Sequence, residues 1–346
     1  MTPQRRQLAV LVAVLVAAVI VVALVLVLPG DGDSSPKASP TTTSATSAQP
    51  TPTPTPSPTV KAELVSSMDV KVSGDFGKKP KLTVPDDDPS KKLLLQIVSE
   101  GDGPAVVAGQ TTVLDYLGQT WKPKKGKANV FDNSFDRKTP SVFVAGSPDL
   151  IAGWNAAVVG LKVGSRALVS IPPKFGYGAK KEEGKELSGE TLLFVIDIHA
   201  AYAPDATADG AEVAPTVEGL PEVESKSGQK PKITSIEGAS ADGDKPRSGL
   251  LIEGTGEKID PARKLVFQVV ETKPGSTEIS GDTWTQGGPQ VVDASQILQM
   301  AKALIGQRVG SRAVVVVMPP SQEATGTTPT SPSGPVSLVV DIIGQV

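Results

Sequence analysis

The pattern of apolar positions divides this chain into short extended runs, one helical stretch and one long apolar run at the N-terminus. In the first half of the chain, runs of β-branched, aliphatic or aromatic residues bounded by glycine, proline or aspartate predict β-strands. The predicted strands are residues 93–99, 111–117, 141–145, 166–171 and 192–199. On the last of them, Phe194, Ile196 and Ile198 share the face that is expected to be buried. Asp197 and His199 alternate with them on the opposite face, and His199 is expected to face solvent.

Helical spacing is clear only around residue 154. Leu150, Trp154 and Val158 recur at every fourth position, which gives one apolar face with an indole ring. Ser147 is expected to cap the start of this helix, and Gly160 its end. The strands and the helix together predict an α+β fold, in which an antiparallel sheet wraps over one short helix.

Polar residues are expected beside the predicted helix. Tyr116 lies on the second strand, and the turn FDNSFDR supplies Asp132 and Arg137. Taken alone, Asp132 and Arg137 are an ordinary surface ion pair or a turn with a capping aspartate. Together with Tyr116, Trp154 and the aromatic loop at residues 172–178, they predict an apolar pocket with polar edges. Such a pocket would bind an apolar ring and hold an amide through a few hydrogen bonds.

The chain repeats itself with an offset near 150 residues. The motif KKPKLT at residues 78–83 returns as QKPKIT at 229–234, and VGLKVGSRA at 159–167 returns as IGQRVGSRA at 305–313. The order of the motifs is kept. We therefore predict two copies of one domain, joined by an alanine- and proline-containing segment.

The N-terminus predicts a membrane anchor. Residues 8–28 are uninterrupted apolar residues, enough at 1.5 Å per residue to cross a bilayer core of about 30 Å. Arg5 and Arg6 precede this run, which favours a cytoplasmic N-terminus and extracytoplasmic domains in a single-pass protein of the cell membrane. The alternative is a cleaved signal peptide and a secreted protein. It would need a shorter apolar core and small residues at the cleavage site, and Leu28-Pro29-Gly30 does not resemble one.

After the anchor, proline alternates with threonine and serine, a composition that cannot bury a core and predicts a disordered linker. The expected organisation is a cytoplasmic N-terminus, a transmembrane signal anchor, the linker, a first domain, a second linker and a second domain. Their predicted bounds are residues 1–7, 8–28, 29–60, 61–203, 204–222 and 223–346.

Composition excludes several classes of function. A net charge of −3 argues against a nucleic-acid partner, which would require a basic face. The absence of cysteine excludes thiol catalysis and cysteine-bound zinc, and a single histidine disfavours a histidine-based metal centre. We therefore expect no metal and no cofactor.

The span from about Lys91 to Ala201 resembles the FKBP-type (macrolide-binding) peptidyl-prolyl cis-trans isomerases. The resemblance depends on several motifs in the family's order: Tyr116, Phe131-Asp132, Leu150-Ile151-Ala152-Gly153-Trp154, the turn VGSRA, Gly176-Tyr177-Gly178 and Thr191-Leu192-Leu193-Phe194. It implies a five- or six-stranded antiparallel half-barrel around the short helix. It also implies that prolyl segments of unfolded or exported polypeptides bind over Trp154, and that macrolides of the tacrolimus type are possible inhibitors.

The resemblance also implies roles for individual residues. Asp132 would be the polar contact near the twisting amide, and the Tyr177 hydroxyl and Ile151 N–H would hold substrate carbonyls. The implied catalytic residues are Asp132, Tyr177 and Trp154, and the implied substrate-binding residues are Tyr116, Phe131, Arg137, Phe143, Leu150, Ile151 and Phe194.

Two features depart from the family's pattern. Ser141 stands where the family often has an aromatic residue next to the pocket, although Phe143 follows on the same face. In place of a flap rich in isoleucine and proline, this chain has KKEEGKELSGE, where Leu187 alone is expected to supply an apolar contact. These differences bear on substrate preference and macrolide affinity more than on the fold.

The second copy keeps the strand pattern but lacks the pocket residues. Val269, Met300 and Leu338 stand near the positions of Tyr116, Trp154 and Phe194, and Ser280-Gly281 stands near Phe131-Asp132. We predict a degenerate FKBP-like domain without activity. Two alternatives to an isomerase remain for the whole chain. One is a module that binds prolyl segments without turnover, and the other is a purely structural envelope protein.

Overall fold

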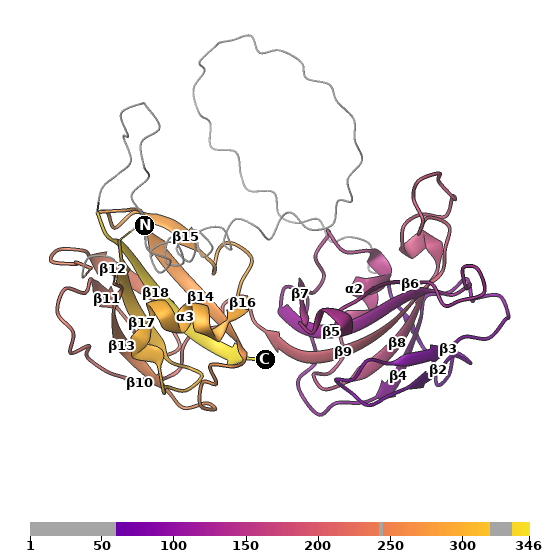
Figure 1. Cartoon of the computed structure of the whole chain (residues 1–346), viewed down its shortest axis with the longest axis horizontal. Coiled ribbons are helices and arrows are strands. Elements are labelled where there is room, and N and C mark those ends of the chain that lie inside the picture. The colour runs from indigo at the N-terminus through magenta and orange to yellow at the C-terminus, as the bar shows by residue number, and fades with distance from the viewer. Residues whose placement is uncertain (1–59, 242–244, 319–333) are drawn as a thin grey trace, which may run out of the picture.

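The computed structural model describes residues 60–241, 245–318 and 334–346, and these form two seven-stranded sheets side by side (Figure 1). The predicted anchor and nearly all of the first linker lie outside these residues. Within the described part of the chain, no helix is long and apolar enough to cross a membrane.

The first copy contains nine strands, one α-helix and two short 3-10 helices. They are β1 (Glu63–Leu64), β2 (Lys71–Ser73), β3 (Lys81–Thr83), β4 (Leu94–Ser99), β5 (Thr111–Thr120), β6 (Val130–Asn133), η2 (Phe135–Arg137), β7 (Ser141–Val144), α2 (Ala152–Val158), β8 (Arg166–Ile171), η3 (Pro173–Phe175) and β9 (Leu192–Tyr202). All five strands predicted here are present, and β8 has the predicted bounds.

The sheet has the order β1-β4-β8-β9-β5-β6, and β7 pairs with β5 beside β6. Every pairing is antiparallel except that of β1 with β4, so the sheet is larger than the five or six antiparallel strands expected. The apolar pattern does not predict β6 or the hairpin of β2 and β3, because their short runs mix polar residues with apolar ones.

The helix begins later than predicted. Ser147 does not cap it; α2 starts at Ala152 with Ile151 as its N-cap, and the C-cap is Val159 rather than Gly160. The Asn155 side chain explains the difference. Its amide donates to the Ser147 carbonyl at 2.7 Å and accepts from the Gly146 N–H at 3.0 Å, which holds the preceding residues in a turn.

Both faces of the first sheet are covered. On one face α2 packs closely, because a Cβ at Gly153 would lie 2.4 Å from Ile171. On the other face, the β2–β3 hairpin and its flanks cover an apolar cluster. The buried residues of this cluster are Met68, Val70, Trp121, Leu168, Leu193 and Val195. As a result β5 is buried along its whole length.

The face that carries Asp197 and His199 is covered by a second layer, so the expectation that His199 faces solvent is only partly met. Asp197 is fully buried and accepts two hydrogen bonds from Arg166, each 2.6 Å long. The hairpin closes over this pair, since Gly77 N–H donates to Asp197 at 2.7 Å. His199 lies partly buried beside it and bonds Asp115 at 2.8 Å. Alternation along a strand separates its two faces but does not tell whether a second layer covers the outer one.

The second copy contains the remaining elements. They are β10 (Gly210–Glu212), β11 (Glu222–Glu224), β12 (Lys232–Ser235), β13 (Arg247–Gly254), β14 (Lys264–Thr272), β15 (Ile279–Asp282), β16 (Gln290–Asp293), α3 (Ala294–Met300), η4 (Lys302–Leu304), β17 (Arg312–Val317) and β18 (Val336–Gln345). Its sheet has the order β10-β13-β17-β18-β14-β15, with β16 on β14, and repeats the strand order of the first sheet. The edge strands differ, because β10 is antiparallel to β13 whereas β1 is parallel to β4. Arg312 and Asp341 repeat the buried pair, with both contacts at 2.6 Å.

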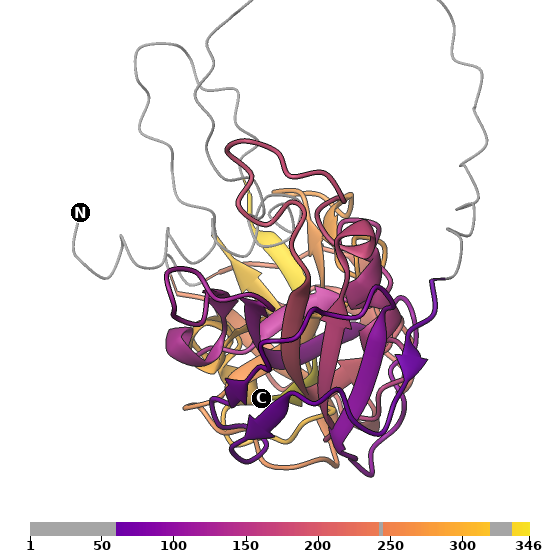
Figure 2. The ribbon, with the colours of Figure 1, turned by 90° about the vertical axis from the view of Figure 1, so that its right-hand side faces the viewer.

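The stretch predicted as a second linker is bound to the second sheet. It contains β10, which pairs with β13. Ala208 N–H donates to Asp341 at 2.7 Å, and the Gln268 amide donates to the Pro204 carbonyl at 2.9 Å. Figure 2 shows the molecule from the side of the first copy, with its indigo and magenta strands in front of the orange and yellow strands of the second. The exact domain boundary stays a prediction.

Candidate functional site

Aromatic rings from five elements meet on the α2 side of the first sheet. They are Tyr116 of β5, Phe131 of β6, Phe143 of β7, Trp154 of α2 and Phe194 of β9. The Trp154 ring is central, with its centroid 5.3 Å from Tyr116, 5.4 Å from Phe143 and 5.1 Å from Phe194. Their edge-to-face geometry is the arrangement that aromatic quadrupoles favour.

A glycine that sequence analysis did not single out makes room for two of these rings. A Cβ at Gly118 would lie 2.6 Å from the Phe194 ring and 2.8 Å from the Phe131 ring. The two rings can therefore approach to 5.5 Å only because position 118 has no side chain. A glycine inside a strand often marks such a close approach, so the signal was present in the sequence.

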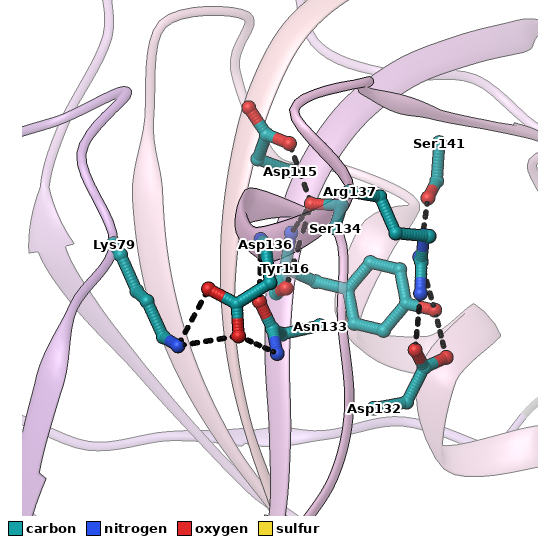
Figure 3. A network of polar contacts seen from close by, with 9 residues as sticks. All are labelled: Lys79, Asp115, Tyr116, Asp132, Asn133, Ser134, Asp136, Arg137 and Ser141. Atoms are coloured by element: carbon teal, nitrogen blue, oxygen red, sulfur yellow. Dashed lines mark hydrogen bonds and ion pairs between the residues drawn. The ribbon is translucent and has the colours of Figure 1, made fainter.

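Asp132 lies at the polar edge of the ring cluster, held by two side chains (Figure 3). The Tyr116 hydroxyl donates to one of its carboxylate oxygens, and Arg137 Nη1 donates to the other. Arg137 Nη2 donates to the Tyr116 hydroxyl and to the Ser141 hydroxyl, both at 3.2 Å. The structure thus brings together the three polar residues that the sequence pointed to and adds Ser141.

The η2 turn that contains Arg137 is held by its neighbours. The Ser134 hydroxyl accepts the Tyr116 N–H at 2.9 Å and donates to Asp115, which joins the start of the turn to β5. Asp136 accepts two hydrogen bonds of 2.7 Å from Lys79, which lies in the β2–β3 hairpin (Figure 3). The hairpin outside the ring cluster therefore contacts the turn that presents Arg137.

The pKa values of the two tyrosines of the site, Tyr116 and Tyr177, are both raised, so both hydroxyls keep their protons well above neutral pH. Burial, and then the bond to Asp132, raise the pKa of Tyr116 to about 12. Burial and the charge of Asp132 also raise the pKa of Tyr177. Tyr177 is 43% exposed, and its hydroxyl has no hydrogen-bond partner among the described residues. Its O–H is therefore free to donate to a bound molecule.

The rim of the cluster comes from the start of α2. Leu150 and Ile151 are half-buried and pack against the ring cluster and its surroundings. Ile151 is the N-cap of α2. Within the described residues its N–H has no acceptor. Ile151 thus offers a backbone hydrogen-bond donor at the edge of the rings, whereas the Asp132 carboxylate is a hydrogen-bond acceptor.

The charged segment KKEEGKELSGE, residues 180–190, replaces the family's apolar flap and is held by ion pairs and backbone hydrogen bonds. Lys181 bonds Glu190 at 2.6 Å, and the Gly189 N–H donates to the Gly178 carbonyl at 2.8 Å. Leu187 packs against the apolar cluster, as predicted.

The described residues contain no group of three or more histidine, aspartate or glutamate side chains placed to hold a metal ion.

Residues 103–199 match the family model described as "FKBP-type peptidyl-prolyl cis-trans isomerase". A relative from Streptomyces anulatus, named "FK506-binding protein", is 37% identical over 124 residues, which cover 97% of the relative and 36% of this chain. The chain belongs to the FKBP-type peptidyl-prolyl cis-trans isomerases. The peptidyl-prolyl cis-trans isomerase FKBP1A of Xenopus laevis is 35% identical over 105 residues, which cover 93% of it and 30% of this chain.

A probable FK506-binding protein of Corynebacterium glutamicum is 33% identical over 124 residues, covering 99% of it and 36% of this chain. The family match lies within the first copy, so the hairpin of this FKBP-type isomerase and its second copy lie outside the matched residues.

The sheet register places the residues of the second copy where the sequence expected them. Val269 lies opposite Val340 as Tyr116 lies opposite Ile196, and Leu338 takes the place of Phe194. The helical segment offers the aliphatic side chains Ile297 and Met300 to the core where the first copy of the isomerase offers Trp154.

The position of Gly118 is taken by Glu271, whose pKa is raised by burial. Gly281 stands opposite Glu271 as Asp132 stands opposite Gly118. A carboxylic acid thus lies where the first copy brings two rings together, and the carboxylate at the edge has no counterpart. The ring cluster and its polar edge occur in the first copy alone among the described residues.

Proposed function

We propose that the first copy catalyses cis-trans isomerisation of X-Pro bonds in unfolded or exported polypeptides, with the prolyl ring held against Trp154. The observation that supports this proposal is a cluster of aromatic rings bordered by the Asp132 carboxylate, itself held by Tyr116 and Arg137. This combination offers an apolar ring a dry surface and offers an amide a fixed polar neighbour.

The reaction needs no nucleophile and no proton transfer. An X-Pro bond has a rotation barrier of about 18–20 kcal/mol, because the planar amide is stabilised by resonance and charge separation. Rotation passes through a twisted amide that has lost both. Walls of apolar rings favour the less charge-separated twisted form over the planar one, and a surface fitted to that form lowers the barrier.

The polar residues position the substrate in this proposal. The Ile151 N–H and the Tyr177 hydroxyl donate to substrate carbonyls on either side of the prolyl ring, since both donors are unpartnered among the described residues. Asp132 lies beside the twisting amide. Phe131, Phe143, Leu150 and Phe194 complete the apolar wall. The same pocket is proposed to bind macrolides of the FK506 type, which the names of two of the relatives mention.

We also propose that residues 8–28 anchor the chain in the cell membrane, with its N-terminus in the cytoplasm and both copies outside. The apolar run and the arginines before it support this location. Sequencing the N-terminus of the mature protein tests it. A protein that begins after residue 28 would instead be a secreted one whose signal has been removed.

The test of the enzymatic proposal is exchange spectroscopy on an X-Pro peptide with the intact chain. We expect accelerated exchange, reduced about tenfold by Tyr177→Phe or Asp132→Val, since each removes a polar contact worth about 1.4 kcal/mol. Tyr202→Phe is the control, because Tyr202 lies at the end of β9, outside the ring cluster. Exchange no faster than in buffer would reject catalysis, and peptide binding without turnover would then identify a prolyl-binding module.

A further inference from the structure

We infer that Ser141 is a positioning residue for the isomerase reaction, acting on Asp132 through Arg137. The inference rests on the proposed function, because it assigns Ser141 a part in the same site. Ser141 itself is not expected to touch substrate or to act in the chemistry.

The guanidinium of Arg137 donates hydrogen bonds from both of its terminal nitrogens. Nη1 donates to Asp132, while Nη2 donates to the Tyr116 hydroxyl and to the Ser141 hydroxyl, both at 3.2 Å. A guanidinium is planar and rigid, so an acceptor that fixes Nη2 also fixes the direction of Nη1. The Arg137 side chain is 47% exposed, so packing alone does not hold it.

Ser141 is well placed to serve as a fixed point. It is the first residue of β7, and its backbone lies opposite Leu114 in β5. Arg137, in contrast, ends the η2 turn and is followed by Lys138 in the left-handed conformation, with φ of 54°. Ser141 therefore ties a side chain from a short turn to the sheet that holds the aromatic rings.

The second copy separates this contact from the general scaffold. Gln290 lies opposite Phe267 as Ser141 lies opposite Leu114, and its side chain donates to the Gly288 carbonyl at 3.0 Å. The counterpart of Asp132 there is Gly281, so serine and carboxylate are lost together.

The hairpin contact behaves differently. Lys79 bonds Asp136 in the first copy, and Lys230, at the same place in the repeated motif, bonds Asp282 in the second. Asp282 stands at the position of Asn133 rather than of Asp136, so the lysine keeps an ion pair with this part of the chain through a different aspartate. An ion pair of this lysine that persists in a copy without the ring cluster is assigned to the scaffold. The Ser141 contact is lost with the cluster, which assigns it to the site.

The expected consequence is a change in turnover rather than in binding. When Ser141 no longer holds Nη2, Arg137 samples other rotamers, and the Asp132 carboxylate loses its fixed orientation toward the twisting amide. The rings that bind the prolyl group are unaffected. We therefore expect kcat to fall while KM stays close to its original value, the signature of an interaction made in the transition state.

Ser141→Thr and Ser141→Val in the intact chain provide the test, because the two side chains have nearly the same shape and only threonine keeps the hydroxyl. We expect valine to lower kcat about fivefold, as for the loss of one hydrogen bond to a charged group, and threonine to stay within about twofold of the original. Ser90→Ala is the matched control. The Ser90 hydroxyl accepts the Lys92 N–H at 3.1 Å away from the ring cluster.

The guanidinium resonances of Arg137 give a second measurement. We expect faster rotation about the guanidinium bonds in Ser141→Val than in Ser141→Thr. Equal kcat values for the two variants, or a loss confined to KM, would overturn the inference while leaving the isomerase proposal intact. An original chain without exchange activity would reject the isomerase proposal, and equal guanidinium rotation in the two variants would then reject the positioning of Arg137 as well.

Discussion

In the first copy Arg166 bonds a buried Asp197 beneath a hairpin, and in the second copy Arg312 bonds Asp341 in the same place. The order of the strands is the same in both. The cores beside the helices differ. In the first copy Trp154 of α2 meets four aromatic rings from the sheet and a bound carboxylate, whereas in the second copy the core is aliphatic apart from Phe267 and Met300.

This difference separates what the fold requires from what the activity requires. The motif VGSRA is kept in both copies because its arginine makes the buried ion pair, and the motif KPK with its flanks is kept because the hairpin covers that pair. Trp154, Tyr177 and Asp132 are free to disappear without loss of the sheet. Their presence in the first copy alone is what the proposed binding and catalysis would require.

The largest effect is expected where the copies agree. Arg166→Met and Arg312→Met each leave a buried carboxylate without its partner, which should cost about 3–5 kcal/mol of unfolding free energy. Urea unfolding of the intact chain measures both. Arg263→Met serves as the control, because Arg263 forms an exposed pair with Glu257. If the unfolding free energy fell by less than about 1 kcal/mol for one of the two variants, the buried ion pair would contribute less to the stability of that copy than to the other.

Trp154→Ala should remove the activity of the intact chain. Loss of the central ring is expected to lower the exchange rate at least 100-fold, or about 2.7 kcal/mol, because the second copy has no ring cluster that could replace it. Met300→Ala is the matched change in the second copy and should leave exchange unchanged. Trp154→Phe keeps a ring at this position and checks that the loss of exchange activity is not caused by unfolding of the first copy. A residual rate near half of the original would mean that the second copy is active.

A pH titration distinguishes the copies through Tyr116, whose counterpart Val269 cannot ionise. Because the pKa of Tyr116 rises from 10.0 to about 12 on folding, the folded state holds its proton more tightly than the unfolded chain. The stability this gives is complete below pH 10 and is lost as the pH rises toward 12, at most about 2.7 kcal/mol. Unfolding free energies from about pH 9 to 11 should fall more steeply for the original chain than for Tyr116→Phe. Parallel curves would contradict this pKa shift.

The smallest effects are expected at the hairpin lysines. Lys79→Met and Lys230→Met each remove an ion pair on the outer surface, where such pairs contribute little. We expect Lys79→Met to leave kcat within about twofold of the original, although Asp136 precedes Arg137 directly. A loss of kcat as large as in Ser141→Val would place the hairpin contact in the site rather than in the scaffold.

The strands could be predicted because their apolar runs are continuous and end at glycine or proline. Residues 166–171 were predicted exactly, but β5 and β9 run three residues further than expected, to Thr120 and Tyr202. The extra residues include glycine, glutamine and alanine. Their conformation depends on pairing with neighbouring strands, which the local pattern does not contain.

The composition of the ring cluster could be predicted from motifs in the family's order, but its construction could not. Gly118 was missed because its importance lies in the distance between two rings on other strands. Ser141 was noted only as a missing aromatic residue, since its bond to Arg137 depends on how the η2 turn directs the arginine. The burial of Asp197 was not predicted, because the hairpin that covers it lies more than a hundred residues earlier.

The contact between Gly77 and Asp197 joins residues 120 positions apart, so it cannot form until β9 has been synthesised. As the chain is synthesised, the hairpin appears first and has no ion pair to cover until β9 has followed. Closing so long a loop is slow, because its entropy is lost before the contact repays it. We therefore expect the segment before β4 to stay accessible to proteases and chaperones during synthesis, and its burial to mark the completion of the first copy.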